Sequence, residues 1–106
     1  MGDLSAPLPL RSIADATAAR YGVSAQDLYG PRQLARIALP RHVLCYLAAQ
    51  HSRLNATAVG RLMRRHPTTI TYGRDKIAAQ VGVDARLRAD VAAIRGALGV
   101  GEAGDA

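Results

Sequence analysis

The residues with the most chemical character lie between Leu54 and Ile77, where the sequence reads LNATAVGRLMRRHPTTITYGRDKI. This pattern predicts two short helices joined by a basic turn, which is the arrangement of a DNA-binding helix-turn-helix. Threonines follow the turn directly, and a threonine offers a hydroxyl to a base or phosphate and a methyl group to thymine. The candidate DNA contacts in this segment are Arg64, Arg65, His66, Pro67, Thr68, Thr69, Thr71, Tyr72, Arg74 and Lys76.

Positive charge is concentrated around the same segment. Residues 31–76 hold nine Lys or Arg side chains and one acid, whereas the remainder holds five Arg and seven acids. This placement favours a polyanion such as double-stranded DNA. The connector from Arg32 to Arg41, which includes Arg36, is a second basic element that can enter the minor groove beside the major-groove helix. The alternatives are an ordinary solvated loop for this element and a solvated, threonine-rich helix start for the first.

The sequence contains no catalytic or metal-binding pattern. Its three histidines do not form a metal-ligand spacing with the single cysteine, Cys45, which we expect to be a small buried thiol. Phosphate-binding glycine loops are absent, and the central region has no paired carboxylates. We therefore predict no enzyme activity, no metal and no cofactor.

The composition predicts one domain in a cytoplasmic, nucleoid-associated protein. A single cysteine suits a reducing compartment. The chain has no apolar run near the ~20 residues that cross a bilayer, so we expect no membrane contact. Residues 1–10 are interpreted as a flexible arm because of two prolines, residues 11–98 as the domain, and residues 99–106 as a disordered tail.

Helical periodicity without any alternating strand pattern predicts an all-α fold of about six helices. Ser12, Ser24, Asn55 and Asp84 are placed to cap helices, and Pro40 and Pro67 to open them. The expected helices cover about residues 13–21, 25–29, 40–52, 56–63, 67–81 and 85–98, with a basic connector over residues 32–39.

Three apolar stripes are expected to face the core. They are Val59, Leu62 and Met63; Ile70, Gly73 (or Ala78) and Ile77; and Leu87, Val91, Ile94 and Leu98. Gly60 inside its helix indicates close approach of another helix backbone. On the last helix, Asp84, Arg86, Arg88, Asp90 and Arg95 are expected to face solvent, with a partner-binding surface as the alternative.

Together these features resemble the C-terminal DNA-binding domain of the bacterial replication initiator DnaA, over about residues 13–98. The resemblance is carried by Tyr21-Gly-Val, Ile37-Ala-Leu-Pro-Arg41-His-Val, Val59-Gly60, Thr68-Thr69-Ile70 and Lys76-Ile77. It implies a Trp-repressor-like helix arrangement and monomeric binding to a short asymmetric DNA box. The second helix of the motif would lie in the major groove and the basic loop toward the minor groove. Arg41, Thr68 and Thr69 fall on family contact positions.

The turn departs from the family pattern. Members usually have Gly-Arg-Asp-His before Thr-Thr, whereas this chain has Arg64-Arg65-His66-Pro67. The family's minor-groove arginine aligns near Gln33. We therefore expect weak binding to the standard initiator box, or preference for another sequence.

The resemblance does not extend to the family's ATPase domain, so we expect neither assembly on ATP nor origin melting. Two roles are left open for a stand-alone DNA-binding protein of a bacterium or phage: regulation of replication initiation, and regulation of transcription. The alternative from a different class is an adaptor that binds the initiator or another protein through the same fold, with DNA binding secondary.

Overall fold

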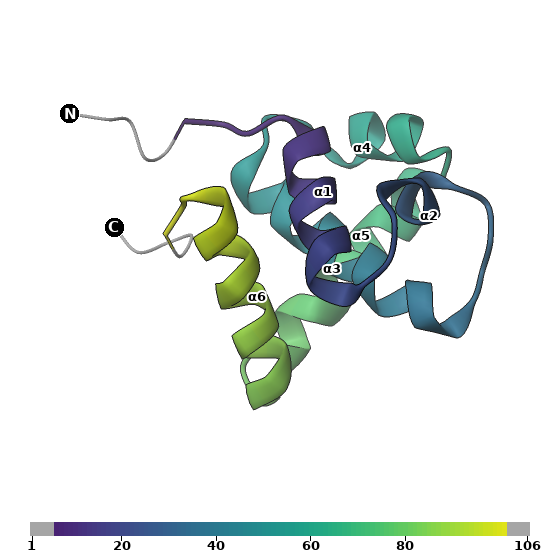
Figure 1. The fold of residues 1–106 in the computed structure, drawn as a ribbon. Coiled ribbons are helices and arrows are strands. Elements are labelled where there is room, and N and C mark those ends of the chain that lie inside the picture. The colour runs from purple at the N-terminus through teal and green to yellow at the C-terminus, as the bar shows by residue number, and fades with distance from the viewer. Residues whose placement is uncertain (1–5, 102–106) are drawn as a thin grey trace.

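The computed structural model describes residues 6–101 (Figure 1). This part of the chain contains six helices and no strand. The helices are α1 (Leu10–Tyr21), α2 (Ala25–Tyr29), α3 (Ala35–His51), α4 (Ala56–Met63), α5 (Pro67–Gln80) and α6 (Ala85–Leu98). The predicted all-α fold of about six helices is confirmed.

Helix capping explains why most of the predicted boundaries are correct. The Ser24 hydroxyl accepts a hydrogen bond from the Asp27 N–H, and the Asp27 carboxylate accepts one from the Ser24 N–H, which makes a capping box. The side chains of Asn55 and Asp84 cap α4 and α6 in the predicted way. Pro67 opens α5. Short polar side chains accept the free N–H groups of a first turn, so these starts are encoded locally.

Two predicted helix starts are wrong. Ser12 does not cap α1, which begins at Leu10 after Pro9, and no side-chain cap is present there. The long central helix α3 begins at Ala35, so Pro40 lies inside it and part of the predicted connector is helical. In both cases the added turn buries an apolar side chain, Leu10 in α1 and Ile37 in α3. Tertiary burial has overridden the local signals.

The predicted arm lies partly outside the described residues, as does most of the predicted tail. Residues 6–9 are described, and they are extended. The Leu8 N–H donates to the His51 carbonyl at 2.6 Å, and its half-buried side chain packs against the core. This part of the segment is therefore held against the end of α3.

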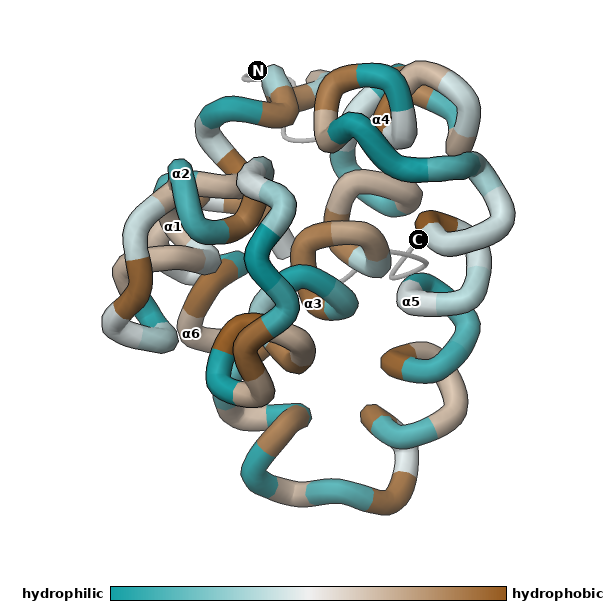
Figure 2. The backbone as a smooth tube through the Cα atoms, turned by 90° about the vertical axis from the view of Figure 1, so that its right-hand side faces the viewer, coloured by the Kyte–Doolittle hydropathy of each residue, from teal (hydrophilic) through white to brown (hydrophobic). Residues whose placement is uncertain are grey.

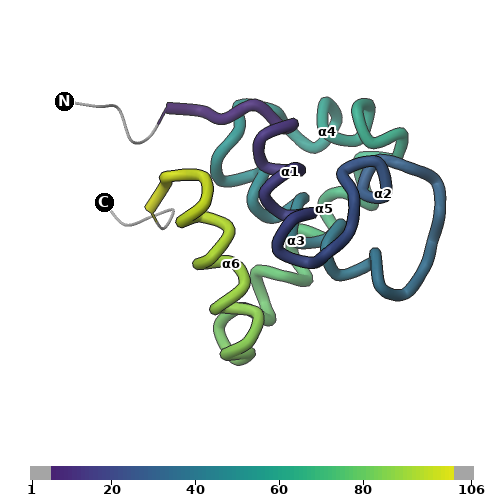
Figure 3. The backbone as a smooth tube through the Cα atoms, viewed as in Figure 1, coloured from purple at the N-terminus to yellow at the C-terminus, as the bar shows by residue number. Residues whose placement is uncertain are grey.

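Helix α3 lies at the centre of the fold, with α1 and α5 packed against it (Figure 3). The core is aliphatic, and Ile13, Leu44, Leu47 and Ile77 are fully buried. Helix α5 lies so close to α3 that a Cβ atom on Gly73 would be 2.8 Å from the His42 ring. Gly73, with Ile70 and Ile77, forms the predicted inner face of α5.

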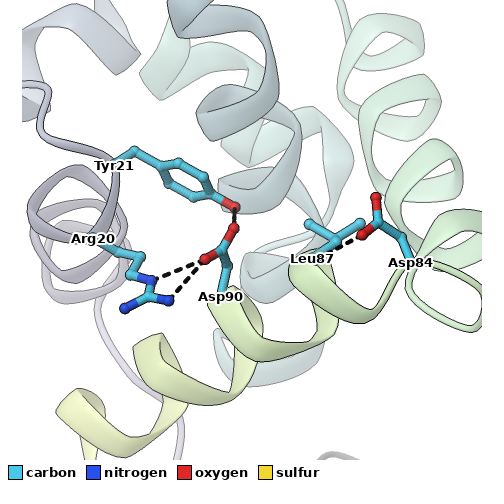
Figure 4. Close-up of polar contacts among 5 residues, drawn as sticks. All are labelled: Arg20, Tyr21, Asp84, Leu87 and Asp90. Atoms are coloured by element: carbon cyan, nitrogen blue, oxygen red, sulfur yellow. Dashed lines mark hydrogen bonds and ion pairs between the residues drawn. The ribbon is translucent and has the colours of Figure 1, made fainter.

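Helix α6 packs on α1 through a polar contact that contradicts the predicted solvent position of Asp90. The Asp90 carboxylate is almost fully buried and accepts hydrogen bonds from Arg20 Nε at 3.0 Å and the Tyr21 hydroxyl at 3.1 Å (Figure 4). Arg95, also expected outside, is buried, and its Nε donates a hydrogen bond to His51 Nε2 at 3.1 Å. A buried charged side chain is costly unless hydrogen-bond partners surround it, and these contacts supply such partners.

The apolar stripe on α4 is corrected at Leu62. Val59, Gly60 and Met63 are buried, whereas Leu62 is 55% exposed. Val59 and Met63 are about one helical turn apart and form the buried seam with Gly60, whereas position 62 lies on the side of Val59 and Met63 away from Gly60. Leu62 is rotated out of that seam, toward solvent.

We expect Met63→Ala to lower the free energy of unfolding by about 2–5 kcal/mol, because it removes a fully buried side chain and leaves a cavity. The matched variant is Leu62→Ala on the same helix, which should change stability by about 0.5 kcal/mol or less. Urea denaturation followed by circular dichroism measures both. Equal losses in the two variants would contradict the observed orientation of α4.

Stability should also fall when the pH drops below about 6.5. Burial lowers the pKa of His51 and of His42, with smaller contributions from Arg95 and Lys76 respectively. The unfolded chain then binds protons that the folded protein resists, so folding is favoured above the ordinary histidine pKa and disfavoured below it. The check is urea denaturation at about pH 7.5 and about pH 5.5, where carboxylates stay ionised. An unchanged urea midpoint would refute it.

Candidate nucleic-acid interface

The turn between α4 and α5 is tight, and its geometry depends on the backbone at Gly60 and Arg64. Arg64 ends α4 in the left-handed conformation, with φ of 56°. The next amide, on Arg65, donates to the Gly60 carbonyl at 2.8 Å. A Cβ atom on Gly60 would lie 2.5 Å from the Arg65 carbonyl oxygen. The sequence predicted close approach of another helix at Gly60, but the nearest backbone atom belongs to the turn itself.

The first turn of α5 presents two free threonines. Thr68 and Thr69 are both exposed. The exposed side chain of His66 caps the helix, since its Nδ1 accepts the Thr68 N–H at 3.1 Å. Thr71 differs from the other two, because it is half-buried and its hydroxyl donates to the Pro67 carbonyl at 3.1 Å. The structure therefore leaves two of the three predicted threonine hydroxyls available to a ligand.

Further along α5, Tyr72 and Lys76 continue the exposed face. Tyr72 is 59% exposed and meets the ring of His42 edge-on, with centroids 5.8 Å apart. The Lys76 ammonium lies 5.8 Å from the Tyr72 ring centroid, within range of a cation–π contact. These side chains lie outside the buried face of the helix. Helix α5 therefore packs one face on the domain and leaves another exposed, as a recognition helix does.

Arg74 lies on the other flank of α5, next to the start of α4. It borders a small hollow that Leu54, Asn55 and Ala56 also line. Its Nε is 2.9 Å from the neighbouring Asp75 carboxylate, and both side chains are well exposed. Exposed ion pairs are weak, so Arg74 can still exchange this partner for a phosphate.

The predicted basic element lies beside α5. Arg32 and Gln33 are exposed in the segment between α2 and α3, and Arg36 is exposed in the first turn of α3. A cleft of about 330 Å³ is lined by residues of both elements, among them Gln33 of this segment and Thr69 of α5. Figure 2 shows the hydrophilic α2–α3 segment and the α4–α5 turn on the same face of the molecule. The structure thus brings together the two elements that the sequence only suggested separately.

Two of the predicted contacts, Arg41 and Arg65, point into the protein. Arg41 is 8% exposed, and its guanidinium donates to the carbonyls of Asp27, Leu28 and Gly30. Arg65 is half-buried and donates to the carbonyls of Met63 and Gly30. Several of the N–H groups of these two guanidiniums therefore bond within the fold.

The inward placement of Arg41 is indicated by its spacing from buried residues of the same helix. It stands four residues after Ile37 and three before Leu44, both of which are fully buried. That spacing puts it on the inner face of a helix, provided that the helix begins before Pro40. The incorrect start predicted for α3 concealed this position.

Other candidate chemistry is not supported. Burial raises the pKa of the Cys45 thiol to about 11, so it stays protonated and unreactive. Within residues 6–101 no group of three His, Cys, Asp or Glu is arranged to hold a metal ion. None of the helices described is long and apolar enough to span a membrane.

Charge at the interface is largely free of internal partners. In the described part of the chain the ion pairs are Arg20–Asp90 and Arg74–Asp75. Arg32, Arg36, Arg64 and Lys76 are exposed and have no acid within ion-pair distance there. Such unpaired cations create a positive surface that attracts phosphates.

Comparison with known proteins agrees with this geometry. Residues 10–77 match the family model described as the bacterial DnaA protein helix-turn-helix. The chain is 43% identical over 79 residues to the chromosomal replication initiator protein DnaA of Roseiflexus castenholzii, which covers 74% of this chain and 16% of that protein. For the protein of the same name from Thermomicrobium roseum the identity is 37% over 87 residues, covering 81% of this chain and 19% of that protein.

A more distant relative, the chromosomal replication initiator protein DnaA of Lacticaseibacillus casei, is 28% identical over 99 residues and covers 92% of this chain. The chain spans only 16% to 22% of the length of these three relatives. The similarity therefore concerns one domain of much longer proteins. The fold, the exposed start of α5 and these matches show that the chain belongs to the bacterial DnaA helix-turn-helix family, a family of DNA-binding domains.

Proposed function

We propose that this protein binds double-stranded DNA with a sequence preference and so regulates replication initiation or transcription. Helix α5 enters the major groove, and the α2–α3 segment lies toward the minor groove. One observation carries the proposal: the exposed Thr69 at the start of α5 and the exposed Gln33 of the α2–α3 segment line the same cleft. A helix and a loop held side by side can engage adjacent grooves of one duplex.

The roles of the contacts follow from exposure and chemistry. Thr68 and Thr69 read base edges, and Tyr72 extends the contact along the groove. Arg32 and Gln33 approach the minor groove. Phosphates are neutralised by the cations around these elements, which are the exposed Arg36, Arg64 and Lys76 and the partly exposed Arg74.

The surface supports a monomer on a short asymmetric site, because one helix and one different loop make up the two halves of the contact. His66 uses one ring nitrogen to cap α5, and Pro67 has no N–H. His66 and Pro67 replace the Asp-His pair that family members usually have before the two threonines. The standard initiator box should therefore bind less tightly than a box selected by this protein.

A selection of bound duplexes from a random pool tests the proposal. The expected result is one enriched sequence motif that binds more tightly than random duplex at ~0.15 M salt. Equal affinity for all duplexes, at the ~10⁻⁴–10⁻⁶ M typical of non-specific binding, would refute sequence preference. Retained cellular function in a Thr68→Ala, Thr69→Ala double variant would favour the adaptor alternative.

Thr69→Ala should change the preferred sequence, because it removes a base-reading hydroxyl and methyl. The expected cost on the parental site is about 1–3 kcal/mol. Thr71→Ala is the matched control, since its hydroxyl is already bonded within α5 and its loss should leave the selected motif unchanged. The measurement is fluorescence titration plus repeated selection. A motif altered only in the control would mean that α5 docks by a different face.

Arg64→Gln should weaken binding to every sequence by a similar factor and lower the slope of log K against log salt by about one. The reason is the loss of one phosphate contact without loss of base reading. Arg86→Gln removes the same charge from an exposed position on α6, a helix that lies away from the α2–α3 segment (Figure 3), and should leave the slope unchanged. Titrations at several salt concentrations distinguish the two. An equal effect of both variants would show that net charge alone drives binding.

A further inference from the structure

A single carbonyl oxygen, that of Gly30, accepts hydrogen bonds from two arginines. Arg41 Nη2 lies 2.6 Å from it and Arg65 Nη2 lies 2.7 Å from it. We propose that Arg41 and Arg65 are positioning residues that hold residues 30–34 beside the start of α5, so that segment and helix meet DNA as one rigid surface. The inference rests on the proposed DNA binding, and it assigns to these arginines a role other than contact with DNA.

Each arginine joins different parts of the fold to that oxygen. Arg41 extends from the middle of α3, and it also donates to the carbonyls of Asp27 at 2.7 Å and Leu28 at 3.2 Å. It therefore ties α3 to the C-terminal end of α2. Arg65 extends from the α4–α5 turn and donates to the Met63 carbonyl at 2.8 Å. The two side chains thus connect α2, α3 and the helix-turn-helix at the point where the segment begins.

The segment has little else to hold it. Among the described residues, no backbone–backbone hydrogen bond involves residues 31–33, and Pro31 has no N–H to donate. The last backbone contact before this gap is the Gly30 N–H on the Gln26 carbonyl at 2.8 Å, and the first after it is the Ile37 N–H on the Leu34 carbonyl. A segment without such bonds is flexible unless side chains restrain its ends. The two guanidinium groups supply that restraint at its start.

Arginine is the residue type that this geometry requires. A planar guanidinium has five donors in a fixed fork and can reach several carbonyls at once, whereas a lysine ammonium on a flexible stem cannot reproduce that arrangement. Placing two cations together has a cost, and burial together with the Arg65 charge lowers the pKa of Arg41. Neither cation has a carboxylate within ion-pair distance in residues 6–101. Their charge therefore remains unneutralised beneath the proposed DNA-binding surface.

The test uses Arg41→Lys and Arg65→Lys, which keep the net charge and remove the fork. Arg61→Lys is the matched control, because Arg61 is exposed on α4 and its side chain has no hydrogen bond to any residue between 6 and 101. The first measurement is ¹⁵N relaxation of the backbone amides of Arg32, Gln33 and Leu34 in the free protein. The order parameters of these amides should be near ~0.85 in the parent and control. They should fall below ~0.6 in the Arg41→Lys and Arg65→Lys variants.

The second measurement is a double-mutant cycle on DNA. The loop variant is Arg32→Ala combined with Gln33→Ala. In the parent it should weaken binding to the selected site by about fivefold or more, as expected for a lost base contact. In the Arg65→Lys background it should weaken binding by about twofold or less, because an unrestrained segment no longer contributes a defined contact.

Several results would overturn the inference. Unchanged order parameters in both lysine variants would show that the segment does not depend on the arginines. A mobile segment with a fully additive cycle would show that its position does not matter for DNA. Because Arg41 is buried, its variant is interpreted only if its thermal unfolding remains cooperative, and the half-buried Arg65 provides the second case. If the order parameters fall but the parent selects no DNA, the proposed function fails and the positioning role stands.

Discussion

The direct contact of α5 with α3 at Gly73 is the constraint on which the rest of the structure depends. With no Cβ atom at that position, the backbone of α5 comes up against His42, and the flanking Ile70 and Ile77 reach the core. Gly60 does the same for the turn that leads into α5. Larger side chains at these two positions would push the helix outward. The exposed threonines keep their place relative to the α2–α3 segment only because α5 is seated so closely.

A small aliphatic core supports this arrangement, and buried polar groups determine how its outer helices attach. The chain has four tyrosines and no other aromatic residue, so close helix packing must replace bulky side chains. Asp90 fastens α6 to α1 by accepting from Arg20 and Tyr21 (Figure 4). Helix α6 lies away from the α2–α3 segment (Figure 3). Its role is therefore to complete the core rather than to extend the positive surface.

The cations of the central region fall into two groups with different physical tasks. Arg32, Arg36, Arg64 and Lys76 are exposed and have no acid in ion-pair range within the described residues. Arg41 and Arg65 instead donate to backbone carbonyls at the junction of three elements. Both groups add to the positive potential, because a hydrogen bond to a carbonyl does not neutralise a charge. Only the first group can exchange water for phosphate without disturbing the fold.

Much of the fold and part of the candidate interface were predictable from local sequence. The starts of α2, α4, α5 and α6 follow from capping side chains and a first-position proline, because these signals act within a few residues. The exposed Thr68 and Thr69 at the start of α5 follow from the same local geometry. The clustering of basic residues around the motif needed no structure at all.

The true start of α3 could not be predicted in this way, because burial of Ile37 outweighs an internal proline. The inward positions of Arg41 and Asp90 depend on partners more than ten residues away, at Gly30 and at Arg20. A charged residue looks the same in sequence whether it faces solvent or a buried carbonyl. The sequence by itself therefore determined the helices and the sign of the surface. Tertiary structure decided which charges are free to meet DNA, since only packing across distant segments supplies the groups that bind the others.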